Sequence, residues 1–192
     1  INKLVSASAD IAGKGISLET GVMAKQANGS VTVRAGDMIL LATATMAKNA
    51  RENLDFMPLT IEYSEKMYAA GKIPGGFFKR EARPSTNATL IARLIDRPLR
   101  PSFPKNVNRE VQVVITMLSY DPSVVPDFLS IIAASAALSL SDIPFNGPIG
   151  AAIVGLEKGQ LIANPDSETL KTCDLNIIVA GTKEAVLMVE AG

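Results

Sequence analysis

The sequence predicts a single α+β domain in which mixed sheets pack against helices. Short segments of alternating or β-branched apolar residues are separated by turns, and two longer segments have helical periodicity. The 192-residue chain is 47% apolar and 20% charged, a balance typical of globular domains. Because internal repeats and low-complexity linkers are absent from the sequence, we expect one domain over residues 1–192.

The strands are expected largely in hairpins. Gly36 and Asp37 form a turn pair between two apolar segments, which is typical of a β-hairpin. The last two segments are almost wholly apolar, so we expect them to be buried strands. The segments expected to be strands are 30–37, 38–48, 56–66, 110–120, 175–181 and 185–192, with a second hairpin over 149–165.

Two helices are expected. The first begins at the capping-type residues Ser85 and Thr86 and stops near Pro98. The second spans 126–141, and Pro126 suits its first turn. Its closely spaced alanines should let the second helix pack tightly on a sheet. The residues of the first helix expected to face the core are Leu90, Ile91, Leu94 and Ile95.

Charge and composition exclude several function classes. The 19 basic and 19 acidic residues cancel, so any anion site must come from local clustering. The chain has no histidine and a single cysteine, Cys173, which excludes a histidine base, a Cys/His nucleophile pair and a Cys/His zinc site. The apolar stretch 130–140 is too short to cross a bilayer, so no membrane partner is expected. Without an initiator Met or a signal-peptide core, we expect a processed chain or a fragment.

The segment GGFFKREARP, residues 75–84, combines adjacent aromatic residues with cations in a loop. Aromatic faces stack on bases of any identity while Lys and Arg hold the backbone, which is how single-stranded nucleic acid is bound without sequence preference. The alternative is that Phe77 and Phe78 fold inward as a local core plug. The loop is therefore a candidate path for single-stranded RNA or DNA through Phe77, Phe78, Lys79, Arg80 and Arg83.

The first helix carries Arg93, Arg97 and Arg100, which share a face at 3.6 residues per turn. Guanidinium groups bind phosphate in a bidentate manner, so this row suits successive phosphates. The alternative is a solvated face in which Asp96 or Glu81 pairs with a neighbouring arginine.

Three long motifs make a family resemblance specific. They are YAAGKIPGGFFKREARPSTNATLIARLIDRPLRPSFP, ASAALSLSDIPFNGPIGAAIVG and VAGTKEAVLMVEAG, which belong to a likeness extending from about Gly15 to Gly192. The chain resembles the first RNase PH-like core domain of the polynucleotide phosphorylases. The resemblance implies a fold of the ribosomal protein S5 domain 2-like type. It also implies a phosphorolytic 3′-to-5′ exoribonuclease that uses inorganic phosphate as co-substrate.

The resemblance also implies an RNA path. In the family, the loop matching 77–80 lines the neck of a homotrimeric ring, and the residues matching Arg93, Arg97 and Arg100 face the RNA. Many relatives have Arg where this chain has Lys79, which weakens bidentate phosphate contact there. Implied partners are single-stranded RNA, a second core domain, the ring itself and RNA degradosome components. The implied location is cytoplasmic of the bacterial type, with an organellar origin left open.

The family has two such cores, of which only the second is catalytic, and this chain matches the silent one. Where the active core has a Ser-rich turn for phosphate, this chain has residues 124–127, including Pro126 and Asp127. The acidic motif that holds Mg²⁺ in the active core is matched by Leu170, Asp174, Asn176 and Ile178, and only one of these is an acid. We therefore expect no catalytic or metal-binding residue here, and Mg²⁺ on the second core.

Three functions compete at this point. The chain is the non-catalytic half of a longer enzyme, a stand-alone RNA-binding or scaffold subunit of an exosome-like ring, or a complete RNase PH-type enzyme. The substitutions at Val125 and Asp127, and those at Asn176 and Ile178, count against the third.

Overall fold

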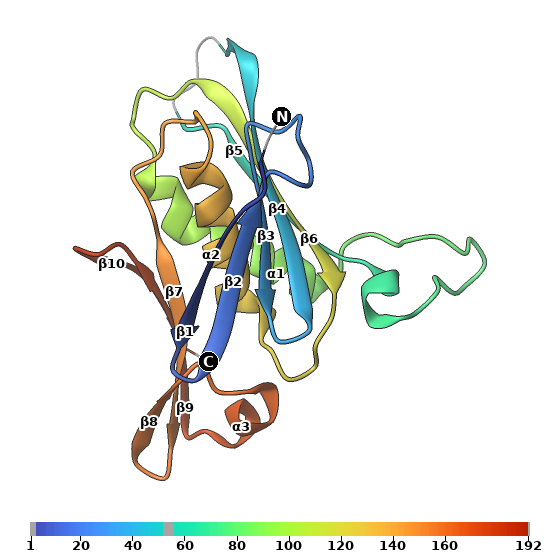
Figure 1. The fold of residues 1–192 in the computed structure, drawn as a ribbon, viewed down its shortest axis with the longest axis vertical. Coiled ribbons are helices and arrows are strands. Elements are labelled where there is room, and N and C mark those ends of the chain that lie inside the picture. Colours follow the sequence, from blue (N-terminus) through green and yellow to red (C-terminus); the bar gives the residue numbers. More distant parts are fainter. Residues whose placement is uncertain (1–2, 52–55, 192) are drawn as a thin grey trace.

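The computed structural model describes residues 3–51 and 56–191, and in it helices lie between two sheets (Figure 1). The larger sheet has the strand order β1-β2-β3-β4-β6-β5, and the smaller has the order β10-β9-β7-β8. The strands of the larger sheet are β1 (Val5–Ile11), β2 (Lys14–Thr20), β3 (Gly29–Ala35), β4 (Met38–Ala50), β5 (Leu59–Glu65) and β6 (Arg109–Ser119). Those of the smaller sheet are β7 (Gly150–Glu157), β8 (Gln160–Ala163), β9 (Leu175–Gly181) and β10 (Val186–Ala191).

The helices are α1 (Thr86–Leu99), α2 (Pro126–Ser139) and the short α3 (Ser167–Thr172), with one-turn 3₁₀ segments η1 (Met67–Ala70) and η2 (Arg100–Ser102). The Ser85 side chain caps α1 by accepting a hydrogen bond from the backbone N–H of Ala88, as the capping pattern predicts. The α+β prediction is confirmed, and so are both helices, although α1 continues through Pro98 by one residue and α2 ends before residue 141.

Both predicted hairpins are present. Strands β3 and β4 pair antiparallel with Ala35 opposite Met38, which leaves Gly36 and Asp37 as the two-residue turn. In the β7–β8 hairpin, Lys158 and Gly159 both adopt left-handed backbone conformations at the turn. Strand β5 pairs parallel to β6, so the chain must cross over between them, and α1 lies in that crossover. The β1–β2 hairpin is an element for which the sequence patterns gave no prediction.

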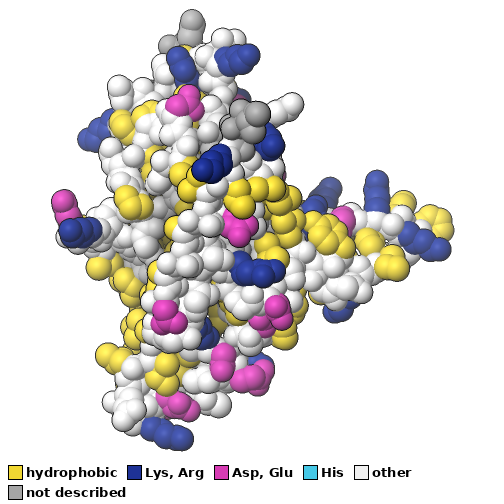
Figure 2. Space-filling model, in the orientation of Figure 1, with side chains coloured by type: hydrophobic (Ala, Val, Ile, Leu, Met, Phe, Trp, Pro, Cys, Tyr) yellow, Lys and Arg dark blue, Asp and Glu magenta, His cyan; other side chains and the backbone are white. Residues whose placement is uncertain are grey.

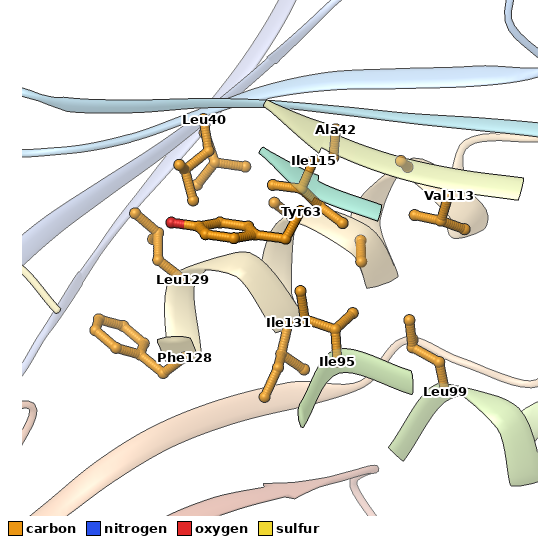
Figure 3. Packing of buried hydrophobic residues seen from close by; sticks show 14 of the residues in the cluster. Leu40, Ala42, Tyr63, Ile95, Leu99, Val113, Ile115, Phe128, Leu129 and Ile131 are labelled. Atoms are coloured by element: carbon orange, nitrogen blue, oxygen red, sulfur yellow. The ribbon is translucent and has the colours of Figure 1, made fainter. Parts of the chain in front are cut away.

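One hydrophobic core lies between the larger sheet and the helices (Figure 3). In this view, Leu40 and Ile115 of the sheet face Ile95 of α1 and Leu129 of α2, with the Tyr63 ring between the layers. The alanines of α2 allow the close packing that the sequence predicts. At Gly29, a Cβ atom would lie 2.1 Å from the carbonyl oxygen of Ala137, so α2 touches the β3 backbone there.

Two burial predictions are wrong. Leu90 was expected to face the core but is 59% exposed, because Ala88, Ile91 and Leu94 form the buried stripe and Leu90 lies on the arginine side of the helix. Strands β9 and β10 were expected to be buried, yet most of their residues are half-buried or exposed. Within residues 3–51 and 56–191, the helices cover one face of the smaller sheet and leave the other uncovered.

No helix among the described residues is long and apolar enough to cross a membrane.

Candidate nucleic-acid interface

The segment between β5 and α1 projects from the body of the molecule, and we call residues 66–85 the arm (Figure 1). It begins with η1, which Gly71 closes in a left-handed conformation. The Glu81 carboxylate accepts a hydrogen bond from the backbone N–H of Met67 at 3.0 Å, which ties the outgoing limb of the arm to the returning one. Glu81 therefore holds the arm together rather than pairing with an arginine.

Two phenylalanines lie exposed on the arm. Phe77 is 95% exposed and Phe78 is 73% exposed. Their rings meet edge to face with centroids 5.4 Å apart, and the Arg80 guanidinium lies 5.1 Å from the centroid of the Phe78 ring, a cation–π contact. The core-plug alternative is wrong, because neither side chain enters the core. Both rings are therefore exposed to solvent, where a ligand could reach them.

The arm's cations are exposed beside these rings. Lys79, Arg80 and Arg83 are all exposed, and within residues 3–51 and 56–191 none of them has an ion-pair partner. Basic and apolar side chains stand close together on the arm (Figure 2). The arm therefore combines the stacking surfaces and the positive charge that binding of a single-stranded nucleic acid requires.

A cleft of about 830 Å³ lies at the foot of the arm. The residues that line it include Arg80 and Arg83 of the arm, Val125 and Pro126 at the start of α2, and Tyr63 of β5. The Arg80 and Arg83 side chains thus border both the arm's surface and this cleft.

Some arginines of the row on α1 form ion pairs within the chain. Arg93 and Arg97 are exposed, and Leu90 lies beside them on the same face of the helix. Arg97 forms an exposed ion pair with Glu190 of β10, a kind of contact that contributes about 0–1 kcal/mol. Within the described part of the chain Arg93 has no ion-pair partner. Both guanidinium groups can therefore reach an incoming phosphate, Arg97 after giving up a weak contact.

Arg100, the third arginine of the predicted row, is hydrogen-bonded within the chain, and its role in RNA binding stays a prediction. Its guanidinium donates to both carboxylate oxygens of Asp96 and to the carbonyl oxygens of Met57, at 2.9 Å, and Leu59, at 3.1 Å. The alternative of pairing with Asp96 is confirmed at this position. Because the carbonyls belong to the segment entering β5, Arg100 holds the end of α1 to the sheet.

The start of α2 lacks the features of a phosphate site. Val125 occupies the N-cap position without a side-chain capping bond, and Pro126 removes a backbone donor in the first turn. Burial, with a contribution from the nearby Glu65 charge, raises the pKa of the Asp127 carboxyl. An acid at the positive end of a helix opposes a second anion, so inorganic phosphate does not fit here.

Tyr63 adds to the low polarity of this region. The residue is 3% exposed, and its hydroxyl has no hydrogen-bond partner among the described residues. Burial raises the Tyr63 pKa strongly, with smaller contributions from the charges of Glu65 and Asp127. The hydroxyl is therefore neutral throughout the physiological range.

The positions that match the acidic motif do not form a metal site. Asp174 is exposed in the bend before β9, where its N–H donates to the carbonyl of Leu156, as expected for a strand-edge residue. Ile178 packs against the core, and the side-chain oxygen of Asn176 is buried without a partner. Among the described residues no group of His, Cys, Asp or Glu could hold a metal ion. Mg²⁺ does not fit these residues.

Cys173 behaves as a packing residue. It is half-buried, and its sulfur lies 2.7 Å from the point where a Cβ of Gly155 would be. Cys173 therefore occupies the space that the glycine leaves.

The sequence patterns did not predict two contacts within the arm. The contact of Arg80 with the Phe78 ring depends on the left-handed backbone of the residue between them, Lys79, with φ of 46°. The link from Glu81 to Met67 also depends on how the arm folds back. The glycines of the arm signal a turn, but no local pattern shows which side chains the turn brings together.

Comparison with known proteins decides the family. The family model described as "3' exoribonuclease family, domain 1" matches residues 12–144, and the model for domain 2 of that family matches residues 147–192. The chain belongs to the 3′ exoribonuclease family, also called the RNase PH family. The fold and the kinship expected from the sequence are thereby confirmed.

Two similar curated relatives share a name. The chain is 59% identical over 189 residues to the polyribonucleotide nucleotidyltransferase of Chloroflexus aurantiacus, which covers 98% of this chain and 25% of the relative. It is 56% identical over 185 residues to the polyribonucleotide nucleotidyltransferase of Heliobacterium modesticaldum, with 96% of this chain and 26% of the relative covered. The chain thus spans about a quarter of the length of the relatives it matches.

A solved structure shares the fold at low identity. The structure titled "Archaeal exosome core" superposes with a TM-score of 0.64 at 16% identity, and the match covers 100% of this chain and 75% of that one. At this identity the match supports the fold alone.

Proposed function

We propose that this chain is the non-catalytic, RNA-binding core of a phosphorolytic 3′-to-5′ exoribonuclease. The observation that carries the proposal is the arm, where Phe77 and Phe78 are exposed beside Lys79, Arg80 and Arg83. Exposed aromatic side chains are costly unless they meet a partner, and a single-stranded nucleic acid offers base faces and phosphates together. The family and the names of the relatives support RNA as that partner.

The arm and α1 would divide the binding between them. Bases would stack on the phenylalanine rings, while Arg80 and Arg83 would neutralise phosphates near the mouth of the cleft. Arg93 and Arg97 would continue the positive path along α1. None of these contacts reads a base edge, so the binding should tolerate any sequence.

The chemistry is proposed to take place on polypeptide outside this chain. In phosphorolysis, inorganic phosphate attacks the terminal phosphodiester phosphorus, the bond to the 3′ oxygen breaks and that oxygen takes up a proton, and a nucleoside diphosphate leaves. Pro126 and Asp127 do not suit phosphate, and Asp174 alone does not suit Mg²⁺. We therefore place phosphate and Mg²⁺ binding on a second core and propose a homotrimeric ring as the assembly.

A stand-alone subunit of an exosome-like ring is the second candidate. The superposition on the archaeal exosome core favours it by fold. It fits less well, because relatives at 55–59% identity carry the name of a nucleotidyltransferase about four times longer.

Two measurements on two proteins separate these candidates. The complete protein encoded by the gene should release nucleoside diphosphates from single-stranded RNA with phosphate and Mg²⁺, and the 192-residue chain should bind RNA without releasing any. Turnover by the 192-residue chain would overturn the non-catalytic assignment. A complete protein that binds RNA but never consumes phosphate would favour the ring-subunit candidate instead.

A further inference from the structure

The residues that line the cleft at the foot of the arm form two chemical groups. The arm contributes four cations, which are Lys66, Lys72, Arg80 and Arg83. The end of β6, the segment after it and the start of α2 contribute a largely apolar and aromatic group, which comprises Met117, Tyr120, Val124, Val125 and Pro126. A ligand of this cleft should therefore carry both negative charge and a flat, apolar surface.

The four cations are not neutralised by the chain itself. Within residues 3–51 and 56–191 none of them has an ion-pair partner. Two carboxylates, Glu65 and Glu81, line the same cleft, and in this part of the chain neither of them pairs with a cation. Glu81 instead accepts a hydrogen bond from the backbone N–H of Met67. Like charges around one concavity attract a multiply charged anion, so the arm's share of the lining is typical of a site for phosphate groups.

Tyr63 adds a buried hydrogen-bonding group to the lining. The residue is almost fully buried, and its hydroxyl has no hydrogen-bond partner among the described residues. Burial raises the Tyr63 pKa most, and smaller contributions come from groups that include Glu65 and Tyr120, which line the cleft as well. The hydroxyl therefore lies near residues of the cleft, and a buried hydroxyl without a partner is costly. A ligand with N–H groups, such as a nucleobase, would supply the missing hydrogen bond.

The lining suits a nucleotide in one direction. Pro126 withholds a backbone donor and the acidic Asp127 beside it opposes an anion, so phosphate groups belong near the arm and not near α2. The Tyr120 side chain is 45% exposed and offers a ring on which a base can stack. The cleft volume of about 830 Å³ lies within the roughly 300–1,000 Å³ of small-molecule sites. A single nucleotide therefore fits with its base toward Tyr120 and its phosphates among the cations of the arm.

The charge pattern favours a free nucleotide over a nucleotide of an RNA strand. A strand spaces single phosphates along its length, which suits Arg93 and Arg97 one turn apart on α1. A nucleoside diphosphate instead joins its phosphates at one end, where the cations around one cleft can contact them together. Phe77 and Phe78, the stacking surface proposed for RNA, line a neighbouring pocket and do not line the cleft.

We infer that the cleft binds a free nucleoside diphosphate, with its base against Tyr120 and its phosphates among the four cations of the arm. The choice of this nucleotide class rests on the proposed function, because phosphorolysis releases nucleoside diphosphates. Arg80 and Arg83 line both the cleft and the pocket beside Phe78, so bound product would compete with RNA for these guanidinium groups. The site would thereby weaken RNA binding as product accumulates.

Photolabelling of the complete protein with a photoreactive azido derivative of ADP tests the inference. The label should attach within residues 117–126, and ADP should prevent this at least about tenfold more effectively than pyrophosphate, which lacks the base. Replacing Lys66 and Lys72 together by Ala should reduce the labelling about tenfold, because charge-assisted contacts to phosphate are lost. The matched control is Phe77→Ala with Phe78→Ala, which should leave the labelling unchanged.

Three outcomes would overturn the inference. They are absence of label from residues 117–126, equal competition by pyrophosphate, and a loss of RNA affinity in the lysine variant that equals its loss of labelling. The second would make an inorganic anion the occupant, and the third would make it a nucleotide of the RNA. The unsubstituted protein alone decides the first two, so they do not depend on whether the variants fold.

The same experiment separates the inference from the proposed function. Label within residues 117–126 of a complete protein that releases no nucleoside diphosphate would refute the proposed function and leave the nucleotide site intact. Phosphorolysis by a complete protein that takes up no label there would refute the inference alone.

Discussion

The arm and the start of α2 border the same cleft but have opposite surface chemistry. On the arm, Phe77 and Arg80 are exposed and offer stacking and positive charge. At the start of α2, Pro126 removes a donor and Asp127 carries a raised pKa from burial and from Glu65. The arm therefore has the chemistry that the proposed RNA binding requires, whereas the start of α2 does not suit inorganic phosphate.

The largest expected effect is on the arm. Replacing Phe77 and Phe78 together by Ala should weaken single-stranded RNA binding by roughly 1–3 kcal/mol for each lost stack, with the thermal melting temperature unchanged because both side chains are exposed. Fluorescence anisotropy with labelled RNA measures the affinity. Ile73→Ala is the matched control, since Ile73 is 87% exposed on the same arm and has no aromatic face. Equal losses in the control and the double variant would mean that stacking is not the cause.

Arg100 should affect stability and not RNA affinity, in contrast to the arm. Arg100→Ala leaves the carbonyls of Met57 and Leu59 without their donor and should lower the free energy of unfolding by about 1–3 kcal/mol. Arg93→Ala, on the exposed face of the same helix, should change it by less than about 0.5 kcal/mol. Urea denaturation of both variants measures the difference. A stable Arg100→Ala with weakened RNA binding would return Arg100 to the RNA path.

The helix arginines should act through charge alone. Arg93→Ala and Arg97→Ala should each reduce the slope of log affinity against log salt by about 0.7, as expected when a single strand loses one phosphate contact. Glu190→Gln should modestly tighten binding, because it frees Arg97 from its ion pair. Salt titrations check both, with Arg34→Ala on the outward side of the larger sheet as control. Unchanged slopes in both arginine variants would mean that these arginines are solvated surface residues that do not contact phosphates.

The ionised Asp127 carboxylate should lower the free energy of unfolding in a pH-dependent way. Because its folded pKa is raised, the folded protein binds the proton more tightly, and stability falls as pH rises from the unfolded value of about 3.8 through the folded pKa. Asp127→Asn should therefore raise the melting temperature at pH 7 and flatten this dependence. Glu65→Gln should relieve part of the same penalty, since the Glu65 charge contributes to the shift. A lower melting temperature for Asp127→Asn at pH 7 would contradict this.

The smallest effect is expected at Asp174. In the complete protein, Asp174→Asn should leave the phosphorolysis rate within a few fold of the parent, because its side chain is exposed and belongs to no metal-binding group among the described residues. Loss of a group that acts in the transition state typically costs about 10²-fold or more. A loss on that scale, in a variant that still assembles, would falsify the chemically silent assignment.

Local sequence patterns predicted the elements that carry strong signals. The turn at Gly36 and Asp37, the Ser85 cap and the alanines of α2 each act through neighbouring residues, so a short stretch of sequence specifies their structure. The pairing of β5 with β6 and the exposure of Leu90 were not predicted, because they depend on which distant segments cover each surface.

The sequence by itself determined the α+β class, the chemistry that the chain lacks, and the clustering of aromatic residues and cations in residues 75–84. Only the tertiary structure decided that Phe77 and Phe78 stand in solvent, that Arg100 is bound to the sheet edge, and that the helices leave one face of the smaller sheet uncovered within the described residues. The physical reason is that residue type and local spacing set backbone preference and charge. Burial and free hydrogen-bonding capacity depend on contacts between residues far apart in the chain.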